Sequence, residues 1–189
     1  MRQLGLEDRG PLLALVTRLA YQKGVDLLLE ALPAMLDMGA SLAILGDGDL
    51  AYEAALADVA AAHPGRISTF TGFNDTLAHL LYAGADFFLM PSRYEPCGLG
   101  QMIAQRYGTV PVVRRTGGLA DTVSDGATGY TFDEPTPQAL RAALARALEA
   151  WRKPGAWRTL QRTGMQRDFS WAVPARAYLA AYRRALGRR

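Results

Sequence analysis

Residues 12–38 read LLALVTRLAYQKGVDLLLEALPAMLDM, and this stretch decides the fold class. The apolar run 12–17 predicts a buried β-strand, and residues 25–38 repeat leucines at helical spacing, which predicts an amphipathic helix. The short loop between them carries two cations, Arg18 and Lys23. A buried strand, a short polar loop and a helix together form the repeating unit of a parallel α/β sheet.

The same alternation continues along the chain. Further strands are expected at 41–45, 66–70, 86–90, 110–113 and 129–132, and further helices at 50–62, 75–83, 98–107, 136–151, 154–165 and 171–186. Asp75 is expected to be the N-cap of its helix. We therefore predict an α/β fold, a doubly wound parallel six-stranded Rossmann-like sheet with helices on both faces. Ligands of such sheets bind beyond the carboxyl ends of the strands.

The composition is that of one globular domain. The 189 residues are 50% hydrophobic and 21% charged, and no apolar run reaches the roughly 18 residues that a membrane helix needs. With one cysteine, Cys97, and two histidines, the chain offers no internal disulfide, no multi-cysteine metal site and no histidine-rich catalytic centre. A single cysteine fits a reducing compartment, so we expect a cytoplasmic protein without a membrane partner.

The charge is unevenly distributed. Residues 141–189 hold 12 of the 21 basic side chains and 2 of the 18 acidic ones. Such a segment either meets an anionic partner or forms a solvated arginine-rich helix face. Nucleic acid is not the expected partner, because no recognised module and no interleaving of aromatic and basic residues supports it.

Two loops carry residues suited to a diphosphate. Arg18 and Lys23 form a clamp that would neutralise a departing diphosphate, or else they are two solvated surface cations. In the loop 91–101, PSRYEPCGLGQ, Gly98 and Gly100 would let a phosphate approach the free N–H groups of a helix start. Glu95, just upstream, is better placed for the hydroxyls of an attached sugar.

A third loop, Thr71-Gly72-Phe73-Asn74-Asp75, ends at the same edge of the predicted sheet. Phe73 either stacks on a nucleotide base or serves as a hydrophobic staple for the helix that follows. The residues alone favour neither alternative.

Taken together, RLAYQKG (18–24), TGFND (71–75), SRYEPCGLGQ (92–101) and RRTGGLADTV (114–123) resemble the C-terminal domain of bacterial glycogen synthases and plant starch synthases. The resemblance implies one half of a GT-B fold. It also implies a retaining glycosyltransferase that moves glucose from ADP-glucose to the non-reducing end of an α-1,4-glucan without a metal or other cofactor.

The resemblance assigns roles to residues of these motifs. Arg18 and Lys23 match the pair that stabilises the leaving diphosphate, and Glu95 matches the glutamate that faces the donor sugar. The substrate-binding residues are expected in two segments, one beside the adenine and one at the phosphates: Gly72, Phe73, Cys97, Gly98, Leu99 and Gly100. Cys97 is expected to be a small packing residue rather than a nucleophile.

Departures and look-alikes limit this assignment. Gly100 stands where the family usually has threonine, and Ile103 stands where other superfamily branches have a second glutamate. The Asp47-Gly48-Asp49 sequence resembles a metal-binding D-x-D motif but is expected to be a turn. Arg115–Leu119 resembles the KxGGL signature of the family's N-terminal domain, and we expect a structural turn there.

The resemblance covers one domain of a two-domain enzyme. The chain is expected to lack the N-terminal domain that supplies the acceptor site, and therefore to be inactive alone. Residues 1–170 should form the Rossmann-like domain, whereas helix 171–189 should pack on the absent domain and leave its apolar stripe unburied here. The alternatives are another retaining GT-B enzyme using a UDP- or GDP-sugar, and a non-catalytic nucleotide- or glucan-binding module.

Overall fold

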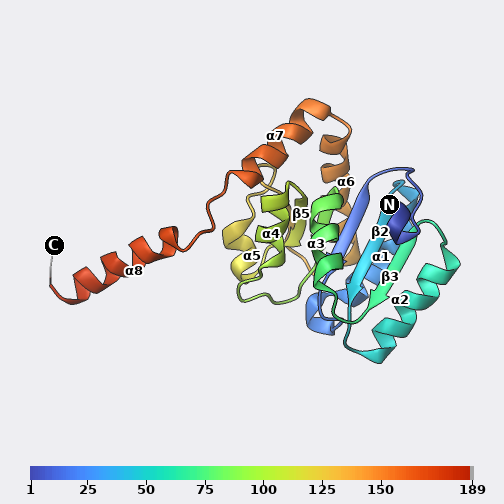
Figure 1. Cartoon of the computed structure of the whole chain (residues 1–189), viewed down its shortest axis with the longest axis horizontal. Coiled ribbons are helices and arrows are strands. Elements are labelled where there is room, and N and C mark those ends of the chain that lie inside the picture. The colour runs from blue at the N-terminus through green and yellow to red at the C-terminus, as the bar shows by residue number, and fades with distance from the viewer. Residues whose placement is uncertain (188–189) are drawn as a thin grey trace.

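The computed structural model describes residues 1–187 and places six strands in one parallel sheet (Figure 1). The strands are β1 (Leu12–Val16), β2 (Ser41–Gly46), β3 (Ile67–Thr71), β4 (Phe87–Met90), β5 (Val110–Arg114) and β6 (Tyr130–Phe132). Their order across the sheet is β3-β2-β1-β4-β5-β6, and every neighbouring pair is parallel. This order confirms the predicted doubly wound fold, and its topological switch lies between β1 and β4.

Helices cover both faces of the sheet. The α-helices are α1 (Val25–Asp37), α2 (Leu50–Ala62), α3 (Asp75–Gly84), α4 (Gly100–Tyr107), α5 (Gly117–Thr122), α6 (Pro137–Trp151), α7 (Pro154–Met165) and α8 (Ala172–Ala185), and the short 3-10 helices are η1 (Arg2–Leu4) and η2 (Tyr21–Lys23). Helices α1, α2 and α6 pack on one face, with α7 beside α6, and α3, α4 and α5 pack on the other. The crossovers therefore bury the strands on both sides.

The side chains of β1 show how the two cores form. Leu13 and Leu15 point into the larger core, with α1 and α6, whereas Leu12 and Ala14 point into the core under α3 and α4. Alternate residues of a strand face opposite sides of the sheet, so a strand buried on both sides needs a continuous apolar sequence. The run LLALV supplies it.

Asp86 fixes the two central strands at their amino ends. Its carboxylate accepts hydrogen bonds from the Leu12 backbone N–H (2.9 Å) and from the Trp151 indole N–H (3.0 Å). The same residue thus joins the start of β1, the start of β4 and the end of α6. The loops at the opposite, carboxyl edge begin from strands whose relative position is already set.

Three local predictions were wrong. The helix expected from residue 98 begins at Gly100, because Gly98 has φ +74°, a left-handed conformation that does not continue into an α-helix. Asn74 rather than Asp75 is the N-cap of α3, and its side chain accepts from the Leu77 N–H at 2.9 Å. The segment expected as a structural turn after β5 contains the helix α5.

Helix α8 stands away from the rest of the molecule at the end of an extended segment (Figure 1). None of its residues is buried, and Trp171, Tyr178 and Tyr182 are 80%, 59% and 62% exposed. The apolar stripe is thus unburied within the chain, as expected, while the surface that it packs against remains a prediction. Within residues 1–187, no helix combines the length and apolar character needed to cross a membrane.

Candidate functional site

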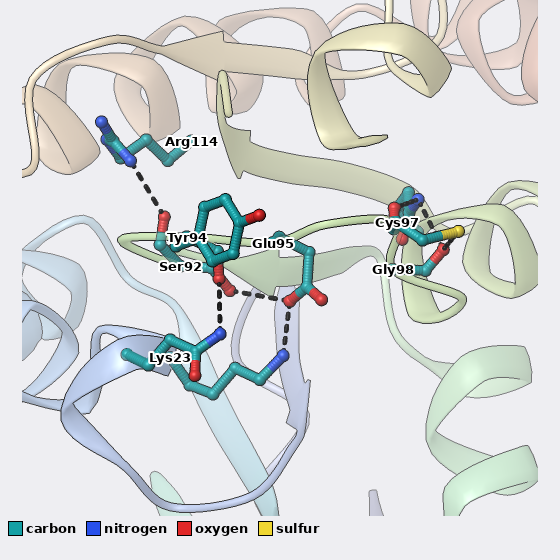
Figure 2. Close-up of polar contacts among 9 residues, drawn as sticks. Lys23, Ser92, Tyr94, Glu95, Cys97, Gly98 and Arg114 are labelled. Carbon is teal, nitrogen blue, oxygen red and sulfur yellow. Dashed lines mark hydrogen bonds and ion pairs between the residues drawn. The ribbon is translucent and has the colours of Figure 1, made fainter. Parts of the chain in front are cut away.

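Two loops meet at the topological switch. The β1–α1 loop contains η2, and the β4–α4 loop contains Ser92 and Glu95. The Lys23 Nζ lies 2.5 Å from Oε2 of Glu95, and the Ser92 hydroxyl donates to the same oxygen at 3.2 Å (Figure 2). Lys23 and Glu95 are 72 positions apart in sequence. They meet because β1 and β4 are neighbours in the sheet.

The environment of this pair suits a charged ligand. Glu95 is only 6% exposed, and an unpaired buried carboxylate is costly, so the cation and the hydroxyl compensate its charge. The lysine ammonium has three N–H donors, one of which serves Glu95. The remaining donors are available to a second anion.

The start of α4 lies beside the pair and is open to an anion. Leu99 is the N-cap without a side-chain capping bond, and the first turn has no acidic residue. Within residues 1–187, the backbone N–H groups of Leu99 and Gly100 donate to no acceptor. Free N–H groups and the helix dipole together favour a phosphate at this position.

Gly100 has a packing reason to be glycine. A Cβ at this position would lie 2.8 Å from the ring of Phe88 on β4 and 3.4 Å from the Tyr82 hydroxyl. A threonine, which the resembled family usually carries here, would require the Phe88 ring to move. Compared with threonine, glycine at position 100 keeps the backbone N–H and lacks the side-chain hydroxyl.

The loop between Glu95 and α4 is held by residues that the sequence analysis did not single out. The Gln101 Nε2 donates to the carbonyls of Cys97 (3.2 Å) and Gly98 (3.0 Å), and to the Thr122 hydroxyl (3.0 Å). Cys97 itself is exposed, so the expectation that it is a packing residue is wrong. Gln101 thereby ties the loop to α5.

The Gly-Gly pair that begins α5 packs on the same loop. The Gly118 N–H donates to the Glu95 carbonyl at 3.1 Å. A Cβ on Gly117 would lie 2.0 Å from the Glu95 carbonyl oxygen, and one on Gly118 would lie 2.2 Å from the Cys97 carbonyl oxygen. This segment, expected to be only a turn, therefore supports the backbone from Glu95 to Cys97, and two successive glycines were the signal.

Arg18 and the third loop border a separate hollow. Arg18, Asp47, Gly72 and Phe73 are among the residues that line this hollow of about 230 Å³ at the ends of β1, β2 and β3. Phe73 is 92% exposed, so it does not act as a hydrophobic staple within this chain and its ring is free to stack. Among residues 1–187, none of the hydrogen bonds or ion pairs involves the Arg18 side chain, which is exposed.

Two larger hollows lie elsewhere. One of about 720 Å³ lies between the N-terminal segment and α3, and one of about 640 Å³ lies between α4 and residues 165–170, with Leu99 at its border. The first is lined mainly by apolar side chains, whereas half of the residues that line the second are polar or charged. We place the site at the switch edge because one cation, Lys23, the buried carboxylate of Glu95 and the open start of α4 lie there, whereas Arg18 lies at the separate hollow.

The D-x-D look-alike is used in a helix cap. The Asp49 side chain accepts from the Ala51 N–H at 2.9 Å, and the Gly48 N–H donates to Glu53 at 2.8 Å. Over residues 1–187, no three histidine, cysteine, aspartate or glutamate side chains gather as metal ligands. Independence from a metal nevertheless remains a prediction.

The family follows from comparison with known proteins. Residues 1–162 match the family described as Glycosyl transferases group 1. The chain belongs to this family. This group 1 glycosyl transferase is 53% identical over 193 residues to the glycogen synthase of Syntrophotalea carbinolica, a match that covers 98% of the chain and 40% of that relative. It is 54% identical to the glycogen synthase of Anaeromyxobacter dehalogenans strain 2CP-C, covering 96% of the chain and 40% of the relative.

A solved structure agrees with the sequence matches. The catalytic domain of starch synthase IV from Arabidopsis thaliana, bound to ADP and acarbose, superposes on this transferase with a TM-score of 0.88 and 34% identity, covering 99% of this chain and 41% of that one. The predicted resemblance to glycogen and starch synthases is confirmed. The chain spans about 40% of the length of the curated relatives described above.

Proposed function

We propose that this chain is the donor-binding half of a glycogen synthase, which transfers glucose from ADP-glucose to the non-reducing end of an α-1,4-glucan with retention of configuration. The observation that carries the proposal is the convergence of Lys23, Glu95 and the open start of α4 at the switch of the sheet. The matches to glycogen synthases and to an ADP-bound starch synthase support it.

Each group has a chemical role in this proposal. Lys23 and Arg18 stabilise the negative charge that develops on the departing diphosphate, while the N–H groups of Leu99 and Gly100 bind a phosphate. Glu95 orients sugar hydroxyls, and Phe73, next to Gly72, stacks on the adenine. Gly98 and Cys97 shape the loop between sugar and phosphate.

The reaction needs no metal in this proposal. The positive charge that a metal would bring to the diphosphate comes from two side-chain cations and a helix dipole. Transfer that persists in excess chelator is therefore the expected result. The acceptor glucan and the other wall of the donor cleft belong to a second domain, and we expect the enzyme to act in the cytoplasm.

A chimera tests the proposal directly. This chain replaces the matching 40% of the Syntrophotalea carbinolica glycogen synthase, and incorporation of glucose into glycogen is measured with ADP-, UDP- and GDP-glucose. Binding of the three nucleoside diphosphates to the 189-residue chain alone is measured by calorimetry. We expect ADP-glucose to be the best donor and the chain alone to catalyse no transfer.

Other outcomes point to other functions. Preference for UDP- or GDP-glucose would identify a different glycosyltransferase of the same fold. Binding of glucan by the chain alone, with an inactive chimera, would identify a non-catalytic module. In either case the proposed reaction would be wrong.

A further inference from the structure

The two loops that carry Lys23 and Glu95 are joined by more than these two side chains. The Arg93 backbone N–H donates to the Gln22 carbonyl at 2.8 Å. The Gln22 side-chain amide donates to the Tyr94 carbonyl at 3.0 Å. Residues directly before Lys23 and directly before Glu95 therefore lie side by side, and the separation of the loops is set by several contacts in parallel.

The Arg93 side chain contacts residues on both sides of Lys23, one in the β1–α1 loop and one in the first turn of α1. Its Nη2 lies 2.6 Å from Oδ2 of Asp26, three residues after Lys23, and both side chains are 23% exposed. Its guanidinium carbon lies 4.2 Å from the ring centroid of Tyr21, two residues before Lys23. An ion pair that is largely shielded from water and a cation–π contact thus act on one segment.

The backbone of Arg93 is also fixed by a contact from strand β5. The Arg114 Nη1, at the end of β5, donates to the Arg93 carbonyl at 2.6 Å. On the outer side, burial and then the negative charges of Asp26 and Asp49 raise the pKa of Tyr52 of α2, so this tyrosine remains a neutral phenol beside the Arg93–Asp26 pair. Arg93 therefore bridges strand β5 and the β1–α1 loop, and its guanidinium is used within the protein.

We propose that Arg93, through Asp26 and Tyr21, is a positioning residue that sets the spacing between Lys23 and Glu95 in the donor site. This role rests on the proposed function, because it gives the spacing a catalytic purpose. Arg93 lies two residues before Glu95, so a shift of its backbone moves the carboxylate. A misplacement of about 1 Å in a reacting site can reduce the rate about 10²-fold.

The chain contains a matched control for this arrangement. Arg146 pairs with Asp125 at 2.8 Å, and its guanidinium carbon lies 5.4 Å from the ring centroid of Tyr130. This second arginine–aspartate–tyrosine group joins α6 to the segment around β6 and touches neither loop of the site. Its removal tests whether loss of any such group has the same effect.

The first measurement needs only this chain. Lys23 and Lys153 are its two lysines, so selective labelling of the lysine side chains gives two NMR signals, with the exposed Lys153 as an internal reference. We expect Arg93→Gln and Asp26→Asn to shift the Lys23 signal toward that of Lys153, and Arg146→Gln to leave both in place. The exchanged pair Asp26→Arg/Arg93→Asp should restore part of the Lys23 shift.

The second measurement uses the chimera. Arg93→Gln and Asp26→Asn should lower kcat by about 10- to 100-fold while the KM for the donor changes by less than about threefold, because the contacts with the donor are kept and their alignment is lost. Arg146→Gln should leave both constants unchanged. An unmoved Lys23 signal in Arg93→Gln, or an equal change in Arg146→Gln, would overturn the inference, as would an unchanged kcat.

The two proposals can fail separately. If the unsubstituted chimera transfers no glucose but the Lys23 signal responds to Arg93 and not to Arg146, the positioning role is supported and the proposed reaction is wrong. If the chimera is active and the signal does not respond, the reaction is supported and the positioning role is wrong.

Discussion

The two loops of the proposed donor site, β1–α1 and β4–α4 (the donor loops), differ from helix α8 in how much of this chain supports them. The loops are joined by the Lys23–Glu95 pair, by the Arg93 contacts and by Gln22, while Gln101 ties the β4–α4 loop to α5. Helix α8 has no buried residue. The conformation of the donor edge is therefore encoded within the chain, whereas the position of α8 has no tertiary support here. Substitutions in the two regions should differ accordingly, in both kind and size.

The largest effect is expected at the centre of the loops. In the chimera, Lys23→Ala should lower kcat by about 10²–10³-fold, because charge stabilisation of the diphosphate is lost and Glu95 keeps a buried charge without its cation. Lys23→Arg should also have a low kcat, since the planar guanidinium of arginine does not replace the compact ammonium of lysine. The reaction is followed with ADP-glucose and glycogen.

Two substitutions complete that experiment. Arg18→Ala should also be slow, because the same leaving group loses its second cation. Lys153→Ala, at the exposed start of α7, is the control and should match the unsubstituted chimera. Rates for Lys23→Ala within about threefold of the control would contradict the leaving-group role.

Glu95 should show a smaller and more selective effect. Glu95→Gln is expected to lower transfer from ADP-glucose by about 10- to 100-fold and to leave ADP affinity within about threefold, because the carboxylate addresses the sugar and not the nucleotide. Affinity is measured on the chain alone by calorimetry. A collapse of ADP binding would instead assign Glu95 a structural role, as the partner that holds Lys23 in place.

The donor loops also show how far the sequence could be interpreted. The apolar runs predicted the sheet, because strands buried on both faces need continuous hydrophobic sequence. The family resemblance assigned Lys23 and Glu95 to one donor site, but their ion pair was not predicted, because contacts across 72 positions depend on strand order. The contacts of Arg93 with Tyr21 and Asp26 could not be predicted, because they depend on side-chain orientations that hydrophobic periodicity does not indicate.

Smaller errors have local causes. Asn74 and Asp75 are both good N-cap residues, so only the backbone decides between them, and Asn74 has the extended conformation of a cap. The two glycines of α5 were interpreted as a turn, although their purpose is close approach to the backbone around Glu95. Glycine pairs predict an unusual backbone environment but not which neighbour requires it.

The support behind the loops should be visible in stability. Gly118→Ala places a Cβ 2.2 Å from the Cys97 carbonyl oxygen, so backbone must move, and we expect a loss of about 1–3 kcal/mol in the free energy of unfolding. Gly155→Ala is the control: nothing lies within 4 Å of its Cβ and it lies in α7, where alanine favours the helix. Urea unfolding of the chain measures both. Equal stabilities of the two variants would mean that α5 does not press on the loop.

The smallest effect is expected at α8. Removal of residues 171–189 should change the free energy of unfolding of the remaining domain by less than about 0.5 kcal/mol, because no buried side chain is lost with α8.

The exposed stripe of Trp171, Tyr178, Tyr182 and Leu186 should instead control association. The intact chain should show a concentration-dependent particle size in X-ray scattering, and the truncated chain should not. In the chimera, we expect α8 to pack on the other domain. The double substitution Tyr178→Asp and Tyr182→Asp should therefore lower the free energy of unfolding of the chimera and leave that of the 189-residue chain alone unchanged. If truncation instead destabilises the separate chain by several kcal/mol, α8 packs on its own domain in solution, and the contrast between the two regions disappears.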